Sequence, residues 1–136
     1  RILGLGGCQK YHPGDHQYTD RQMRGRILKM RWPMRKAKGI DILVTHAPAE
    51  GLGDAEDMAH RGFASLRTFL DKYHPTYHVH GHVHMTYGQN IPRTQDYNGT
   101  TIINAYERYT LELPDREVPE KKKNKLIWMN DPPDYV

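Results

Sequence analysis

Apolar and polar positions divide the first 80 residues into alternating strands and helices. The pattern predicts a short buried strand over residues 1–7, ending in a glycine turn, and a second over Asp41–Thr45, which is apolar with β-branched members. A third strand is expected over residues 76–80, where Gly81 breaks it. Because helical segments separate these strands, the order predicts an α/β chain whose first strands are parallel.

The first helical segment has signals at both of its ends. Thr19 is expected to cap it, because Gln22 three residues later completes a capping box. Apolar residues then recur at near-helical spacing through Met30, and Pro33 predicts the end of the helix, since proline cannot donate a backbone hydrogen bond. The segment between residues 8 and 17 is expected to be a loop.

Apolar residues have helical spacing in the segment before Tyr73 and alternate with polar residues after residue 80. The helix is expected to begin at about Asp57 or Gly62 and to end at Tyr73, before Pro75. After residue 80, apolar and polar residues alternate, which predicts a meander of antiparallel strands. The segments concerned are Thr86–Tyr87, Gly99–Ala105 and Tyr109–Leu113.

Residues 114–136 differ in composition from the rest of the chain. They hold four prolines and the run Lys121–Lys123. We therefore expect an irregular surface tail there, with one possible edge strand at Leu126–Met129, following a folded unit over residues 1–113.

Composition narrows the class of protein. The chain has 136 residues, which suits one domain or part of one, and its single cysteine, Cys8, excludes an internal disulfide framework. No apolar run reaches the roughly 18 residues that a membrane span needs, and no signal-peptide pattern opens the chain. We therefore expect a cytoplasmic protein. Since the chain begins at Arg1, inside a strand pattern, we also expect it to be a piece of a longer protein.

Charge is distributed unevenly. Residues 1–38 hold 10 basic and 2 acidic side chains, a net charge of +8, whereas residues 39–136 have 10 basic and 14 acidic side chains, a net charge of −4. A basic segment can bind nucleic acid. Here the basic residues are spaced all round the predicted helix, and no set of aromatic residues lies between them. A solvated helix surface is therefore favoured, and nucleic-acid binding stays an alternative.

Histidine is the unusual residue, since the chain has nine and four of them lie within seven consecutive residues. Gly81 ends the predicted strand at His80, so His82 and His84 are expected in the loop that follows. His46 lies one residue past the preceding strand. The carboxyl ends of neighbouring parallel strands meet at one edge of a sheet, and neutral imidazole is the commonest metal ligand. The spacing therefore predicts a metal site at this edge.

Several segments, in their order and spacing, resemble signatures of the calcineurin-like metallophosphoesterases. Asp41–Asp54 (DILVTHAPAEGLGD) looks like the strand-His-Ala-Pro signature with its following Gly-x-x-Asp, and Gly81–His84 resembles the closing Gly-His-x-His. Gly99–Ala105 is similar to the Gly-Thr-x-x-x-Asn strand that follows in many members. His60–Gly62 and the Lys72–Pro75 approach to the histidine-rich strand also match.

This resemblance implies an architecture and an activity. The implied fold is half of a four-layer α/β/β/α sandwich, with a mixed sheet and helices on one face. The implied activity is hydrolysis of a phosphoester by a hydroxide bound to two divalent metal ions. His46 and His82 would bind the second metal and His84 the first. Sites rich in imidazole accept Mn, Fe, Zn, Co or Ni.

The chain also departs from the family pattern. The family's Asp-x-His, Gly-Asp-x-x-Asp/Arg and Gly-Asn-His-Asp/Glu segments precede the part seen here, and none is present. Those segments supply the carboxylate of the first metal, the bridging carboxylate and the general acid. The sequence thus resembles the C-terminal half of the enzyme. We expect this chain alone to bind at most one ion and to be inactive. The bare face of its sheet would be covered by the missing half or by a second copy.

Other functions remain open. The chain could be a non-catalytic remnant that binds a metal or a partner, and the basic segment keeps a nucleic-acid-binding module as a third interpretation. If it is an enzyme, its substrate could belong to a phosphatase, a phosphodiesterase or a nuclease, because these share the same chemistry.

Further residues are candidates for supporting roles beside the metal ligands. His60 and Asn104 could support the ligands or touch substrate, and Asp54 could fix the loop after His46. The histidines His78 and His80 are expected to pack or to support the site, and His12, His16 and His74 to lie on the surface.

Overall fold

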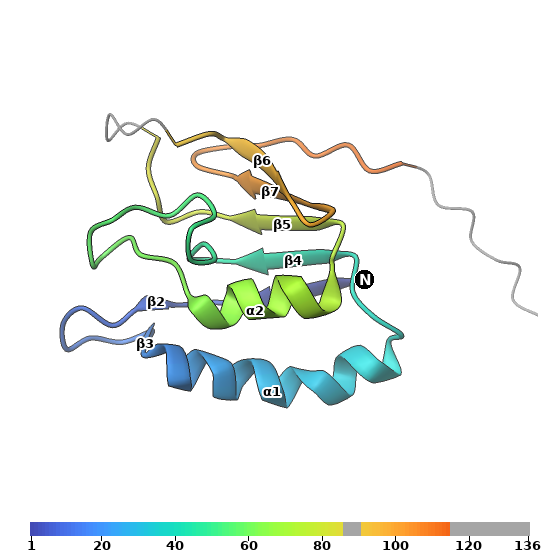
Figure 1. The fold of residues 1–136 in the computed structure, drawn as a ribbon, viewed down its shortest axis with the longest axis horizontal. Coiled ribbons are helices and arrows are strands. Elements are labelled where there is room, and N and C mark those ends of the chain that lie inside the picture. Colours follow the sequence, from blue (N-terminus) through green and yellow to red (C-terminus); the bar gives the residue numbers. More distant parts are fainter. Residues whose placement is uncertain (86–90, 115–136) are drawn as a thin grey trace, which may run out of the picture.

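The fold is a mainly parallel sheet with two helices on one of its faces (Figure 1). The computed structural model describes residues 1–85 and 91–114. The α/β class with parallel first strands is therefore confirmed. In chain order the elements are β1 (Ile2–Leu5), β2 (Cys8–Gln9), β3 (Gln17–Tyr18), α1 (Asp20–Lys36), β4 (Ile42–Thr45), α2 (Ala64–Tyr73), β5 (Tyr77–His80), β6 (Thr94–Tyr97) and β7 (Thr100–Asn104).

The five-stranded sheet has the order β1-β4-β5-β7-β6. Strand β4 lies between β1 and β5 and is parallel to both, and β7 is parallel to β5. Only β6 runs antiparallel, against β7. The antiparallel pairing predicted after residue 80 is present between β6 and β7, but β7 also pairs in parallel with β5, so a purely antiparallel meander is wrong, and Tyr109–Leu113 forms no strand. Residues Thr86–Tyr87 and Leu126–Met129, for which strands were predicted, lie outside the described residues.

The prediction failed at β7 because alternation describes a half-buried strand and says nothing about the direction of its partner. In β7, Ile102 and Ile103 are both buried, and their neighbours in register are His78 and Val79 of β5. Strand β7 thus lies inside the sheet, between β5 and β6.

Helix α1 begins where the sequence predicts and ends later. Thr19 Oγ1 accepts a hydrogen bond from Gln22 N at 3.3 Å, and Gln22 Oε1 accepts one from Thr19 N at 2.8 Å, which confirms the capping box. The helix continues through Pro33 to Lys36, so the predicted end is wrong. Pro33 is on the exposed side, where its missing N–H is tolerated, while Met34 is buried in the core and holds the last turn against the sheet.

Helix α2 begins after both predicted starts and ends at Tyr73, as predicted. It starts at Ala64, because the preceding residues form turns in which Asp57 Oδ1 accepts from the backbone of Ala59 and His60. His74 ends it in a left-handed conformation, with φ of 42°. Neither helix in the described part of the chain is long and apolar enough to cross a membrane.

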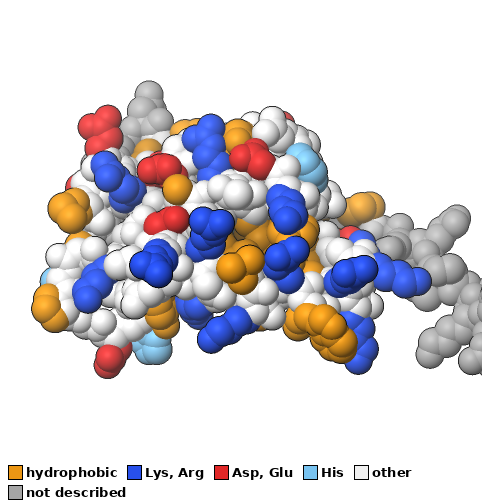
Figure 2. Space-filling view, turned by 60° about the horizontal axis from the view of Figure 1, so that its bottom comes forward, with side chains coloured by type: hydrophobic (Ala, Val, Ile, Leu, Met, Phe, Trp, Pro, Cys, Tyr) orange, Lys and Arg blue, Asp and Glu red, His pale blue; other side chains and the backbone are white. Residues whose placement is uncertain are grey.

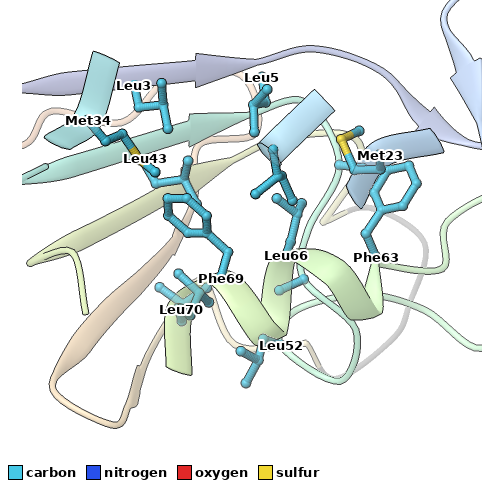
Figure 3. Close-up of a cluster of buried hydrophobic side chains, with 14 residues drawn as sticks. Leu3, Leu5, Met23, Met34, Leu43, Leu52, Phe63, Leu66, Phe69 and Leu70 are labelled. Atoms are coloured by element: carbon cyan, nitrogen blue, oxygen red, sulfur yellow. The ribbon is translucent and has the colours of Figure 1, made fainter. Parts of the chain in front are cut away.

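The hydrophobic core fills the space between the helices and one face of the sheet (Figure 3). Leu3, Leu43 and Ile102 lie in one row across β1, β4 and β7, and α2 supplies Leu66 and Phe69. Met23, Ile27 and Met34 of α1 complete the cluster. This packing fixes the order of the strands, and therefore which strand ends lie beside one another.

The opposite face of the sheet is only partly covered in the described residues. Its rows alternate with those of the core face. Ile103 and Ile42 are buried, but Ile2 is 70% exposed and Val44 is 41% exposed. A pocket beside Ile42 and Tyr77 is also lined by Leu113, so the segment after β7 lies along this side.

The segment predicted as a loop after β1 contains two short strands. Cys8–Gln9 and Gln17–Tyr18 pair in parallel, and Cys8 N donates to His16 O at 3.1 Å. Two-residue strands are too short to give a period in sequence, so no pattern could predict them.

Candidate metal centre

Two of the predicted ligands lie side by side at the carboxyl ends of adjacent strands. His46 follows β4 directly, and His82 follows β5 after Gly81. The backbone joins the two loops, since Gly81 N donates to His46 O at 3.1 Å. The imidazole rings of His46 and His82 have centroids 4.7 Å apart. The parallel pairing of β4 with β5 is the cause, because it brings residues 36 positions apart to the same edge.

His82 is held in a backbone conformation that is rare for histidine. Its φ is 68°, in the left-handed region that favours glycine, and such strain in a non-glycine residue is concentrated at functional sites. The ring is half-buried, and its Nε2–H donates to Ala59 O at 2.7 Å. That bond fixes the tautomer, so Nδ1 has the lone pair. Burial lowers the pKa of His82, and the nearby His46, His60 and His84 lower it further.

His60 extends the group on the other side of His82. The two ring centroids lie 5.2 Å apart. His60 Nδ1–H donates to the Asp57 carboxylate, at 2.9 Å to Oδ1 and 3.0 Å to Oδ2. Although partial burial opposes it, hydrogen bonds from His60 lower the pKa of Asp57. A carboxylate on one ring nitrogen orients the imidazole and makes the other nitrogen more basic, an arrangement common around metal-binding histidines.

His84 lies at the edge of the group. Its ring packs on Tyr106, with centroids 4.7 Å apart and planes 33° apart. It is exposed, and it is near enough to His82 to lower that residue's pKa by electrostatic repulsion. The three predicted ligands therefore lie in one neighbourhood, with His46 and His82 in direct contact.

Asn104 braces the loop that holds His82 and His84. It is fully buried, and its Nδ2 donates to Val83 O at 2.8 Å, while its Oδ1 accepts from Tyr106 N at 2.9 Å. It therefore links the end of β7 to the backbone between the two histidines. Both of these bonds go to backbone atoms, so Asn104 supports the loop and not the histidine rings.

Asp54 ties together the two ends of the loop after His46. Its Oδ1 accepts from Gly51 N at 2.9 Å and its Oδ2 from Gly62 N at 3.0 Å. Both carboxylate oxygens thus have backbone donors. These bonds fix the loop that carries Ala59 and His60, which both contact His82. The role of Asp54 is therefore structural.

The two remaining histidines of the cluster face the core. His78 and His80 are 0% and 2% exposed. Thr45 Oγ1 donates to Ala47 O at 2.6 Å, so it must accept from His78 Nε2–H at 2.8 Å. Burial lowers the pKa of His78 to about 3. His12, His16 and His74 are exposed, as the sequence predicts.

A pocket of about 490 Å³ opens beside His46. Arg26 lines it, with its guanidinium 4.2 Å above the ring of Tyr18 and an Nη1–H bond to Gly6 O. His16 and Cys8 line it as well, and burial raises the pKa of the Cys8 thiol. The positive charge of Arg26 and the imidazole of His46 therefore line the same pocket.

The donor set fits part of a metal centre. His82 has one nitrogen bonded to a carbonyl oxygen and a lone pair on the other, as a metal-binding imidazole requires. Within residues 1–85 and 91–114, however, no group of three or more histidine, cysteine or carboxylate side chains has a geometry that could hold an ion. The described residues therefore present imidazoles without a complete ligand shell.

The chain is similar in sequence to proteins named for a metallophosphoesterase domain. The chain is 35% identical over 85 residues to human and mouse metallophosphoesterase domain-containing protein 1, covering 60% of this chain and 24% of each relative. It is a distant relative of these proteins. Two UPF0046 proteins of Caenorhabditis elegans are 42% identical over 67 residues and 38% identical over 95 residues, matching 48% and 65% of this chain.

The chain spans 17% to 31% of the length of these relatives. No protein-family model matches it. A solved crystal structure superposes with a TM-score of 0.53 at 22% sequence identity, over 78% of this chain and 40% of that one. At this identity the superposition shows a shared fold.

Two partners of the histidine group were not assigned a role from the sequence. Asp57 orients His60, and the carbonyl oxygen of Ala59 orients His82. The sequence left the start of the second helix open between Asp57 and Gly62, so it did not predict the turn that brings the Asp57 carboxylate to His60. A backbone carbonyl leaves no signal in sequence.

Proposed function

We propose that this chain provides the histidine ligands of a phosphoesterase with two divalent metal ions. His46 and His82 bind the second metal and His84 the first. The observation that supports this best is the contact between His46 and His82 at the carboxyl ends of β4 and β5, with ring centroids 4.7 Å apart. The distant relatives named for a metallophosphoesterase domain support the same class of enzyme.

The chain's own groups have distinct tasks in this proposal. A metal pair, when bound, supplies Lewis acidity and neutralises charge on the attacking and leaving oxygens of a phosphoester. Ala59 O accepts from Nε2–H of His82, which would leave Nδ1 of His82 to bind an ion, and the Asp57 carboxylate orients the ring of His60 through its Nδ1–H. His60, Asn104 and Asp54 support the ligands, and His60 can also contact substrate.

The pocket beside His46 suits the anionic part of a substrate. Arg26 is fixed by Gly6 and Tyr18, so its positive charge needs little reorganisation to meet a phosphate. The carboxylates and the general acid come from outside this chain, from the N-terminal half of a longer protein. That half, or a second copy, would cover Ile2 and Val44 on the bare face of the sheet. The metals would be Mn, Fe, Zn, Co or Ni.

A non-catalytic remnant that keeps the histidines is the second candidate. The incomplete ligand shell among the described residues is compatible with it, as it is with the first candidate. The two candidates differ in what the full-length protein does with a phosphoester.

An activity assay separates them. The full-length protein encoded by the gene is compared with the 136-residue chain on a nitrophenyl phosphodiester, with Mn²⁺ added. We expect turnover of about 1 s⁻¹ or more from the full-length protein and no rate above metal in buffer from the chain alone. His82→Ala or His84→Ala abolishes the activity, and His74→Asn, at an exposed histidine before the start of β5 and so at the end of that strand opposite His82, leaves it unchanged. An inactive full-length protein that still binds the metal supports the remnant instead.

A further inference from the structure

A groove runs between α1 and α2, away from the histidine group. The helices pack side by side over the sheet (Figure 1). Two adjoining pockets of about 340 Å³ and 560 Å³ make up the groove, and they share Leu28, Arg31, Lys72 and Tyr73. On α1 the lining extends from Asp20 to Arg35, which at 1.5 Å per residue is a length of about 22 Å.

The groove has large apolar side chains that the core leaves exposed. Trp32 is 72% exposed and Leu28 is 50% exposed, one turn apart on α1. Ile27 and Phe69 form the base of the same groove, where they join the core. Single exposed apolar residues are ordinary, but neighbouring ones that line a hollow mark an interaction site.

Four basic side chains surround this apolar strip. They are Arg24, Arg31 and Arg35 of α1 and Lys72 of α2. Figure 2, turned so that the α1 side comes forward, shows Lys and Arg side chains over this face with hydrophobic side chains between them. Within the part of the chain that the structure describes, none of these four makes an ion pair. Their charge is therefore available to a partner.

The one acidic residue in the lining has another task. Asp20 Oδ1 accepts from Ser65 N at 2.8 Å, at the start of α2, and so caps that helix from its neighbour. Ser65 also lines the groove. Its hydroxyl oxygen is buried and has no hydrogen-bond partner among the described residues. A buried hydroxyl without a partner costs free energy unless a ligand meets it.

We propose that this groove binds an acidic amphipathic helix of a protein partner. Apolar side chains at helical spacing enter the hollow beside Leu28 and Trp32, and flanking carboxylates meet Arg24, Arg31, Arg35 and Lys72. A helix of about 15 residues matches the length of the groove. The site is separate from the histidine group and does not depend on the proposed activity.

A helical peptide fits the surface better than the other polyanions. A nucleic acid needs exposed aromatic rings for stacking or a row of cations at phosphate spacing, and Trp32 is the one exposed aromatic residue in this lining. A membrane needs apolar side chains that protrude from a convex face, whereas the apolar residues here line a hollow. Both remain outcomes of the test.

The test uses the whole chain and a fluorescent peptide of about 15 residues, with leucines at i, i+3 and i+7 and glutamates flanking them. Fluorescence anisotropy measures its binding. The same residues in shuffled order, with the leucines no longer on one face, control for charge alone. Vesicles of phosphatidylserine and phosphatidylcholine, and a DNA duplex, are measured under the same conditions.

Two variants locate the site. Arg31→Glu reverses a charge in the groove, and Lys29→Glu makes the same change on an exposed part of α1 outside it. We expect Arg31→Glu to weaken peptide binding about tenfold or more and Lys29→Glu about twofold at most. Trp32→Ser, at a position so exposed that folding does not depend on it, weakens binding about fivefold.

The outcomes decide the proposal in both directions. Tighter binding of the patterned peptide than of the shuffled one, lost in Arg31→Glu and Trp32→Ser, supports it. Equal binding of both peptides overturns it, because charge alone would then be responsible. Binding of vesicles or DNA in preference to the patterned peptide, or equal effects of Arg31→Glu and Lys29→Glu, overturns it as well.

Discussion

The imidazole of His46 lies against that of His82, with ring centroids 4.7 Å apart, although the residues are 36 positions apart in sequence. Parallel pairing of β4 with β5 produces this contact, and the bond from Gly81 N to His46 O closes it. Ala59 O then orients the His82 ring from a third segment. Three segments of the chain therefore meet at this histidine pair.

The buried histidine His78 should make stability depend on pH. Burial lowers its folded pKa to about 3, below the roughly 6.5 of an unfolded histidine. Its contribution is therefore complete above pH 6.5 and is lost as pH falls toward 3, by about 1.4 kcal/mol for each pH unit. Urea unfolding at pH 6.5 and 5.0 should show His78→Phe losing about 2 kcal/mol less than the wild type over this interval. Equal losses in the two proteins would contradict the burial of a neutral His78.

Gly62 is required by close packing behind the His60 turn. A Cβ at this position would lie 2.4 Å from the carbonyl carbon of Ala49 and 2.6 Å from Glu50 N, which are backbone atoms that cannot move aside. Gly62→Ala should therefore destabilise the protein by about 2–4 kcal/mol, measured by chemical unfolding. Gly25→Ala is the matched control, because a Cβ there meets nothing within 4 Å and alanine favours the helix. A Gly62→Ala protein as stable as Gly25→Ala would show that the loop after β4 is arranged differently.

Asn104 should hold the histidine loop in place. Asn104→Ala leaves Val83 O and Tyr106 N without their partners in a buried place, at a cost of about 2–3 kcal/mol. Hydrogen exchange at Val83 and His84 should speed up more than at β1, because the damage is local. Thr94→Ala, at an exposed position of the neighbouring strand β6, serves as the control. Uniform acceleration across the sheet would mean that Asn104 supports the whole fold and not this loop.

Asp57 should act on metal binding through His60. Asp57→Asn replaces a carboxylate that accepts at 2.9 Å and 3.0 Å from His60 Nδ1, so the imidazole becomes less basic and less well oriented. Because His60 only packs against the proposed ligand His82, Zn²⁺ affinity measured by calorimetry should fall, but by less than the roughly tenfold that loss of a ligand's direct partner costs. Glu56→Gln removes the neighbouring exposed carboxylate and should have no effect. Equal affinities of wild type and Asp57→Asn would remove His60 from the site.

The sequence predicted those parts of the fold that depend on local pattern. The capping box at Thr19, the strand before His46 and the parallel order of the first strands follow from short-range signals, and the structure has all three. The positions of His46 and His82 at neighbouring strand ends follow from that order. The order of the first strands and the placement of these two histidines at neighbouring strand ends could therefore be obtained without coordinates.

The rest depended on contacts between distant segments. Pro33 sits inside α1 because Met34 is drawn into the core, a tertiary effect that overrides a local stop signal. The direction of β7 depends on its partner β5, which lies in an earlier segment. The role of Asp57 depends on a turn that the sequence did not predict. Each difference arises where packing, and not the local period, decided the structure.

The central claim is that His82 binds a metal ion through Nδ1 while Nε2–H stays bonded to Ala59 O. Long-range proton–nitrogen NMR of the histidine rings during titration with Zn²⁺ tests this most directly, because it reports each ring nitrogen separately. The account predicts that Nδ1 of His82 shifts on binding, that Nε2 keeps its proton, that a nitrogen of His46 shifts with it, and that His12 does not respond. Unchanged His82 resonances at saturating Zn²⁺, or a response confined to the surface histidines His12, His16 and His74, would contradict it.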